Sequence, residues 1–209
     1  AELATTSNIT IRTNSVAQAD LPSEAARLIL DDGSLIETEL VIAADGRKSL
    51  MRKTAGISVD TKNYPQTAVV LNFAHERPHG SVSTEFHTRT GPFTQVPLPG
   101  NRSSLVWVVT PQDAIEILQL PAETLNRRIE SQMQSMLGKV TVEGAPQAWP
   151  LSAMTARRFG TGRVALVGEA AHVFPPIGAQ GLNLSLRDIE TFQRRYRGEG
   201  SDLPPVLVR

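Results

Sequence analysis

The sequence predicts a mixed fold, α/β with α+β character, in which an α/β portion is interrupted by a sheet-rich insert and then resumes. Two continuous apolar runs, at residues 40–44 and 163–168, are typical of strands that are covered on both faces. Between them, short strand-like segments separated by Gly and Pro indicate a mostly antiparallel sheet. A domain that the chain leaves and re-enters is typical of two-domain enzymes with the site between the domains.

Alternating or continuous apolar side chains predict the strands of the first portion. These strands are residues 8–12, 25–30, 35–39 and 40–44, with a polar connector from 13 to 24. Asp32-Gly33 predicts a hairpin turn, because this dipeptide tolerates the positive φ that such turns need. Residues 49–55 predict a short helix, which Gly56 closes.

Short strands and one helix are predicted for the insert. The strands are residues 69–73, 83–87, 93–98, 104–109, 140–142 and 147–149. Residues 121–137 predict the helix, because apolar side chains recur on one face at helical spacing. These side chains are Leu125, Ile129, Met133, Met136 and Leu137. We expect the methionines among them to fill the core.

The last portion returns to an α/β pattern. The buried run at 163–168 predicts a strand, and residues 178–196 predict the helix that follows it. Leu182, Leu186, Ile189 and Gln193 share one face of this helix, with Phe192 beside them. Residues 198–209 show no periodicity.

Composition excludes several classes of function. The 209 residues carry 21 basic and 21 acidic side chains, so the basic excess of a nucleic-acid-binding protein is absent. The absence of cysteine excludes disulfides and thiolate chemistry, and it fits a reducing cytoplasm. No stretch approaches the ~18 apolar residues of a membrane span. The four histidines lack metal-ligand spacing, so we expect no metal site.

The strongest candidate site lies at residues 168–183. A buried strand places Glu169 at its carboxyl end, where ligands bind in open α/β sheets, and a carboxylate accepts hydrogen bonds from sugar-like hydroxyls. A Pro-Pro pair ending at Pro176 stiffens the loop, while Gly178 and Gly181 let backbone approach a planar ligand. The start of the following helix would stabilise an anion, such as a reduced flavin. The residues alone also allow a purely structural strand, loop and helix.

A second candidate site follows the strand at 40–44. A turn at the carboxyl end of a strand, an arginine charge and a nearby helix start together favour phosphate. The alternative is an ordinary strand, turn and helix in which Asp45 serves as a cap. The residues of this segment that we single out are Asp45, Gly46, Arg47, Ser49 and Arg52.

Both segments resemble the flavin motifs of the class A flavoprotein monooxygenases of the para-hydroxybenzoate hydroxylase type. The run at 168–183 is similar, without gaps, to the second FAD motif of that family. The run at 44–52 resembles the family's Ala-Asp-Gly-x-x-Ser-x-x-Arg motif. Residues 76–80, 85–92 and 182–188 resemble the polyprenyl-phenol hydroxylases of ubiquinone biosynthesis, which narrows the resemblance to that branch.

The resemblance implies a partial FAD-binding domain at 1–58 and 151–209, with an inserted substrate-binding sheet domain at 59–150. It implies an FAD-dependent monooxygenase that uses NAD(P)H and O2 to hydroxylate a phenolic, polyprenylated substrate of the ubiquinone pathway. Such a substrate would imply peripheral contact with the membrane surface. Glu169 stands where the family usually has Asp beside the ribityl chain, and His172 is expected to hold the loop by hydrogen bonds. The implied cofactor-binding residues are Asp45, Gly46, Arg47, Ser49, Arg52, Gly168, Glu169, Pro176, Gly178, Gln180, Gly181, Leu182 and Asn183.

The family opens with a βαβ unit that bears Gly-x-Gly-x-x-Gly after a strand, and this sequence has none. We therefore expect the chain to be a fragment that lacks the N-terminal dinucleotide-binding unit. Two alternatives remain open. One is another flavoprotein of the same superfamily, such as a halogenase or a prenyl reductase, and the other is a non-catalytic binding module. No side chain is assigned as a catalytic acid or base.

Overall fold

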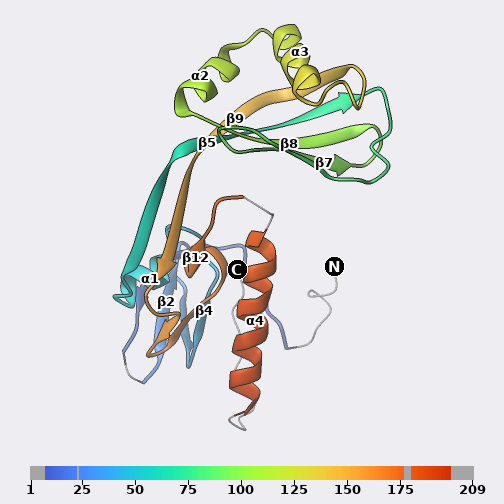
Figure 1. The fold of residues 1–209 in the computed structure, drawn as a ribbon. Helices are drawn as coiled ribbons and strands as arrows, with labels where there is room; N and C mark the ends of the chain where they lie inside the picture. The colour runs from blue at the N-terminus through green and yellow to red at the C-terminus, as the bar shows by residue number, and fades with distance from the viewer. Residues whose placement is uncertain (1–7, 23, 177–179, 199–209) are drawn as a thin grey trace. The chain divides into compact units, whose positions relative to one another are not determined.

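The computed structural model describes residues 8–22, 24–176 and 180–198 (Figure 1). The chain forms two compact units, Ala1–Lys62 with Ala153–Arg209, and Asn63–Ser152. Both boundaries lie within long strands, β5 (Val59–His75) and β9 (Val140–Ala156). The first unit is thus left and re-entered along continuous strands.

In the first unit, three strands form an antiparallel sheet in the order β1-β2-β3. They are β1 (Val16–Asp20), β2 (Ala26–Leu30) and β3 (Leu35–Thr38). Ala26, Leu28 and Leu30 alternate with exposed side chains along β2, so one face of the strand supplies the core. Gly33 has a φ of +80°, and the hairpin turn predicted from Asp32-Gly33 is confirmed.

The predicted strand at 8–12 is wrong. Those residues form no strand, and β1 lies instead in the segment that we expected to be a connector. Backbone pairing explains the difference, because Val16 lies opposite Leu30 and Asp20 lies opposite Arg27. Tertiary pairing therefore outweighs the weak local alternation of residues 8–12.

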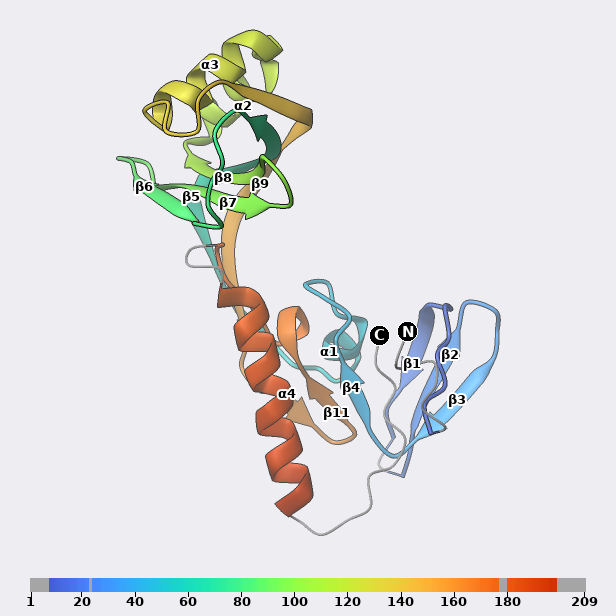
Figure 2. The same cartoon turned by 90° about the vertical axis from the view of Figure 1, so that its right-hand side faces the viewer.

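The two buried runs pair with each other in a second sheet of the first unit. Its order is β10 (Gly160–Thr161), β11 (Val164–Leu166) and β4 (Val41–Ala43), with β11 parallel to β4. Ala165 lies opposite Ile42, and Figure 2 shows the two strands side by side. Val41, Ala43, Val164 and Leu166 are all buried. Residues 41–43 and 164–166 therefore share one core. The sequence predicted both runs as buried strands but did not predict that they pair.

The α-helices in the described part of this unit are α1 (Leu50–Thr54) and α4 (Gln180–Gly198). Leu182, Leu186 and Ile189 do share a face of α4, but this face is exposed, to 72, 54 and 43 % respectively. The half-buried side of the described helix is formed by Leu184, Ser185, Asp188 and Phe192. The apolar row thus does not mark the side that packs on the sheet. No helix in the described part of the chain is long and apolar enough to cross a membrane.

Strands of the second unit belong to a six-stranded sheet with the order β12-β9-β5-β8-β7-β6. The strands not yet given are β6 (Thr84–His87), β7 (Pro92–Leu98) and β8 (Arg102–Val109) of the second unit, and β12 (His172–Val173), which belongs to the first unit. The pairs β5–β8, β8–β7, β7–β6 and β12–β9 are antiparallel. The mixed fold class with a mostly antiparallel insert is confirmed.

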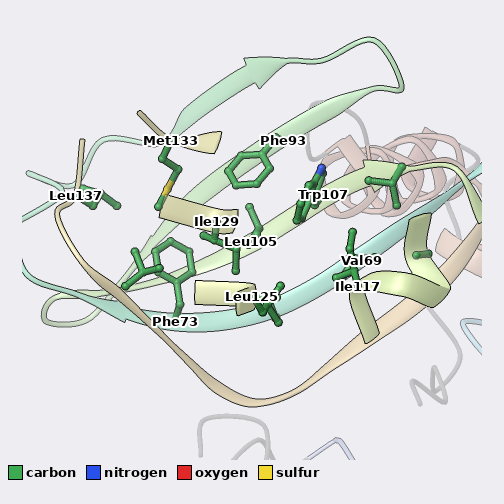
Figure 3. Packing of buried hydrophobic residues seen from close by; sticks show 14 residues of the cluster. Val69, Phe73, Phe93, Leu105, Trp107, Ile117, Leu125, Ile129, Met133 and Leu137 are labelled. Atoms are coloured by element: carbon green, nitrogen blue, oxygen red, sulfur yellow. The ribbon is translucent and has the colours of Figure 1, made fainter. Parts of the chain in front are cut away.

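Helices α2 (Pro111–Gln119) and α3 (Ala122–Gln132) cover one face of the sheet in this unit (Figure 1). Their buried side chains meet those of the strands in a single core (Figure 3). Phe93 packs edge-on against Trp107, with ring centroids 5.2 Å apart. The fully buried members of this core include Val69, Phe73, Phe93, Leu105, Ile117, Ile129 and Met133.

Three expectations for the insert need correction. Helix α3 ends at Gln132 and not at 137, because Gln134 and Ser135 both adopt a φ of +53°. Met133 and Leu137 are nevertheless buried, whereas Met136 is exposed. Helix α2 was not predicted at all. The strands expected at 140–142 and 147–149 are parts of the single strand β9, which also runs through Pro150.

Candidate functional site

The two candidate segments meet at one edge of the parallel strand pair. Because β4 and β11 are adjacent and parallel, their carboxyl ends lie at the same edge, which is where ligands bind in open α/β sheets. The Val167 N–H donates to the Ala43 carbonyl oxygen at 3.0 Å and extends this pairing to the ends of the strands. The turn after β4 carries the first segment, and the 3-10 turn η2 (Gly168–Ala170) after β11 carries the second.

Side chains of the first segment cap helix α1. The Ser49 Oγ is buried and accepts a hydrogen bond from the Arg52 N–H at 3.0 Å. The Asp45 Oδ2 accepts a second one from the Met51 N–H at 3.2 Å. Gly46 has a φ of +79°, which suits glycine at this turn. Asp45 therefore caps α1, as expected for an ordinary strand, turn and helix. Its side chain is also exposed, so a ligand could still contact it.

Arg52 joins the two segments directly. Its Nη1 donates to the Ala170 carbonyl oxygen at 2.7 Å, and its Nη2 donates to the Arg47 carbonyl oxygen at 2.7 Å. The first of these bonds links residues 118 positions apart in the sequence. Sequence patterns suggested only a charge that favours phosphate at Arg52. The geometry shows a guanidinium that donates to the backbone of both segments.

A groove of about 230 Å³ runs along β4 beside the first segment. Its lining residues include Val41, Ala43, Asp45 and Lys48. The groove is apolar along the strand and carries a carboxylate and an ammonium group at the end of the strand.

Two separate constraints favour glycine at position 168, its backbone conformation and a close neighbouring side chain. It has a φ of +58°, and its N–H donates to the Asp188 Oδ2 at 2.9 Å. A Cβ at this position would lie 3.0 Å from the Ser185 Oγ. Both the backbone conformation and the close approach of α4 therefore favour glycine.

Glu169 is exposed at the middle of η2. The residues that the structure describes give its carboxylate no hydrogen-bond or ion-pair partner. A carboxylate that is presented in this way can accept hydrogen bonds from neighbouring hydroxyls of a polyol. This chemistry fits the ribityl chain of a flavin.

The remaining candidate residues surround the start of α4. Pro176 is exposed at the end of the described loop, and Gly178 lies outside the described residues. The first turn of the described helix is exposed to solvent along its backbone and side chains. It contains Gln180, Gly181, Leu182 and Asn183.

His172 and Asp188 form a buried pair beneath the second segment. The His172 Nε2 lies 2.7 Å from the Asp188 Oδ2, and the two side chains are 7 and 15 % exposed. The His172 ring also contacts the rings of Phe159 and Phe174, at centroid distances of 5.8 and 5.3 Å. The expectation that His172 holds the loop agrees with this geometry.

Asp188 was missed by sequence reasoning as a member of the site. It binds both the His172 ring and the Gly168 N–H, which lie 16 and 20 residues earlier. Nothing local distinguishes this aspartate from any other acidic residue on a helix. Only the packing of α4 against η2 reveals its role.

Comparison with known proteins places this geometry in a family. The FAD binding domain model matches residues 4–196. A ubiquinone hydroxylase of Rhodospirillum rubrum is 41 % identical over 166 residues, which are 79 % of this chain and 39 % of the relative. The 3-demethoxyubiquinol 3-hydroxylase of Escherichia coli is 34 % identical over 87 % of this chain and 48 % of its own length. The chain thus spans less than half the length of these two relatives.

A solved structure supports the fold independently. A probable FAD-dependent monooxygenase of Pseudomonas aeruginosa aligns with 87 % of this chain and 52 % of its own, with a TM-score of 0.72 and 23 % identity. The family model and the sequence relatives together go beyond the fold. The chain belongs to the FAD binding domain family of the class A flavin monooxygenases, among whose members it resembles the ubiquinone hydroxylases.

Proposed function

We propose that these residues are part of an FAD-dependent monooxygenase that hydroxylates a phenolic substrate with NAD(P)H and O2. The observation that carries the proposal is the meeting of the two flavin-type segments at the carboxyl ends of β4 and β11, where Arg52 bridges them. Family membership supports the same reading. When bound, FAD would supply the redox chemistry that activates O2.

The substrate class follows from the relatives. Two of them are named for hydroxylation of ubiquinone or its precursors, at 41 and 34 % identity. We infer a polyprenylated phenol of the ubiquinone pathway as the substrate. Such a substrate partitions into the bilayer, so the protein would have to collect it at the membrane surface.

The roles of the residues at the sheet edge follow from their chemistry. The Glu169 carboxylate would accept hydrogen bonds from the ribityl hydroxyls, and Pro176 and Gly178 would lie beside the isoalloxazine ring. The N-terminal turn of α4 would stabilise negative charge on the reduced ring through its N–H groups and positive dipole end. That turn comprises Gln180, Gly181, Leu182 and Asn183.

The first segment would lie near the pyrophosphate and the NAD(P)H path. The backbone turn at Gly46 and Arg47, next to the start of α1, offers N–H groups and positive charge to phosphate oxygens. Asp45 and Ser49 stabilise this turn because their side chains accept hydrogen bonds from backbone N–H groups of α1. The protein would thus bind, orient and desolvate the cofactor, which carries the redox chemistry.

Product analysis tests this proposal. The natural polypeptide that contains these residues would be incubated with NADPH, ¹⁸O2 and a short-chain prenylated phenol, and the products would be analysed by mass spectrometry. We expect one ¹⁸O atom in the phenolic product. A chlorinated product in the presence of chloride, or a reduced prenyl chain, would instead assign the protein to another activity of the superfamily. A purified natural polypeptide without flavin would favour a binding module.

A further inference from the structure

Two charged side chains hold the η2 turn from opposite ends. Asp188 of α4 accepts the N–H of Gly168 at 2.9 Å, and Arg52 of α1 donates to the carbonyl of Ala170 at 2.7 Å. Neither of them forms a hydrogen bond or an ion pair with the Glu169 side chain, which stands between the two bonded residues and is exposed. The position of this carboxylate is therefore determined by groups that do not touch it.

Both side chains also bind a second part of the structure. Arg52 donates to the Arg47 carbonyl at 2.7 Å, so it sets the position of η2 against the turn of the first segment. Asp188 binds the His172 Nε2 at 2.7 Å, so it sets η2 against β12. The Ala171 N–H closes the turn itself by donating to the Gly168 carbonyl at 2.9 Å.

The hydrogen bonds of Arg52 and Asp188, which together we call the clamp, are charge-assisted, and those to Ala170, Gly168 and His172 are partly buried. The Asp188 and His172 side chains are 15 and 7 % exposed, and Arg52 is half-buried. A hydrogen bond to a charged group contributes more than a neutral one, because the charge is not fully solvated by water. The planar guanidinium can also reach two carbonyl oxygens at once, whereas an ammonium group is a single point charge.

We propose that Arg52 and Asp188 are positioning residues that hold Glu169 in one orientation for the polyol part of the ligand. In this assignment the Arg52 guanidinium donates hydrogen bonds to backbone carbonyl oxygens and does not contact phosphate. The proposal rests on the flavin-binding function proposed above and adds to it the means by which the two segments keep a fixed spacing.

Amide hydrogen exchange in the 209-residue chain without ligand gives the first test. In Arg52→Lys and Asp188→Asn, we expect the amides of residues 168–172 to exchange about tenfold faster, while the amides of β8 keep their wild-type rates. Arg194→Lys is the matched control, because Arg194 is exposed and, among the described residues, its ion pair is with Glu190 on the same helix. Unchanged exchange at 168–172, or an equal rise in β8, would overturn the proposal.

A titration with ADP separates the clamp from a phosphate contact. The guanidinium signals of Arg52 would be followed by NMR in the same chain as ADP is added. We expect them to keep their positions, because both Nη groups already donate to carbonyl oxygens. A saturable shift of the Arg52 signals would mean that Arg52 binds phosphate, and it would overturn the assignment.

A double-mutant cycle on FAD affinity tests whether Arg52 acts through Glu169. In the natural polypeptide, Arg52→Lys should weaken FAD binding about tenfold, but it should cost little when Glu169→Gln is already present. Independent, additive effects would overturn the positioning role while leaving FAD binding intact. If the wild-type polypeptide binds no FAD, the proposed function fails, whereas the exchange measurement still decides whether the clamp exists.

Discussion

Two glycines at the carboxyl ends of β4 and β11 meet different constraints although both have positive φ. Gly46, with a φ of +79°, has nothing within 4 Å of the position that a Cβ would take. Gly168, with a φ of +58°, would place a Cβ 3.0 Å from the Ser185 Oγ. Backbone conformation alone therefore acts at Gly46, while conformation and packing act together at Gly168.

Substitution by alanine should separate the two effects. Gly46→Ala should lower the free energy of unfolding by about 1–2 kcal/mol, from the left-handed backbone alone. Gly168→Ala should lower it further, because α4 must also move away. Urea denaturation measures both, and the addition of Ser185→Gly should recover the packing part of the Gly168 cost. Equal losses in the two single variants would show that the Ser185 contact is not limiting.

The Asp60–Arg157 pair predicts a dependence of stability on pH. Hydrogen bonds from Arg157, at 2.8–3.2 Å, hold the pKa of Asp60 below its ordinary value. A carboxyl group whose pKa is lowered by folding stabilises the fold above its unfolded pKa, and this contribution is lost as the pH falls through the folded pKa. The stabilisation is therefore complete at neutral pH and disappears in acid.

Asp60→Asn should lower the free energy of unfolding at about pH 6–7, and the difference from wild type should shrink below about pH 4. Added salt should reduce the difference as well, because both side chains are largely exposed. Chemical denaturation across pH measures this, with Glu24→Gln as a control at an exposed acid. A difference that grew in acid would contradict the sign of the pKa shift.

At the scale of elements, helices α2 and α3 bury some apolar side chains in the core of the insert and leave others exposed. Ile129 of α3 is fully buried among the strands, whereas Ile115 of α2 is 53 % exposed. The same side chain at two helical positions therefore has different surroundings. Helical spacing in the sequence correctly selected Ile129 for the core.

Removal of these two side chains should have unequal effects. Ile129→Ala should lower the free energy of unfolding by about 2–5 kcal/mol, because it leaves a cavity in the core. Ile115→Ala should change it by less than about 1 kcal/mol. Urea denaturation of both variants checks the prediction, and similar losses would mean that the packing on α3 is looser than described.

Element boundaries were the least predictable part. Helix α3 stops at Gln132 because two residues with left-handed backbone follow, and neither Gln134 nor Ser135 is a residue type that announces such a turn. Strand β9 continues through Pro150 because its neighbours in the sheet hold it in place. Long-range pairing, which a local pattern does not contain, sets both limits.

At the scale of the whole molecule, the chain belongs to the FAD binding domain family, and we propose that it contributes one part of a flavin site. The second segment and Arg52 lie at the carboxyl edge of the sheet, but the sequence has no Gly-x-Gly-x-x-Gly after a strand. That element normally holds the pyrophosphate of FAD. We therefore propose that the described residues contact FAD on its ribityl and ring side and at the turn after β4.

We expect the 209-residue chain to bind FAD weakly, with a dissociation constant above about 1 µM, or not at all. The quenching of flavin fluorescence on titration of FAD with the chain measures this. FMN serves as a comparison, because it lacks the adenosine part and should lose little affinity relative to FAD. Submicromolar binding of FAD would show that the chain holds the pyrophosphate by other means.

The sequence by itself determined the fold class, the two buried strands and the two segments whose resemblance indicated the family, whereas the parallel pairing of those strands came from the structure. Apolar runs and the order of Gly, Pro and acidic residues are local properties, so they can be read along the chain. Only the tertiary structure decided that Arg52 and Asp188 hold the turn that carries Glu169. Their partners lie 118 and 20 residues away, and only the packing of α1 and α4 against η2 brings these groups within hydrogen-bonding distance.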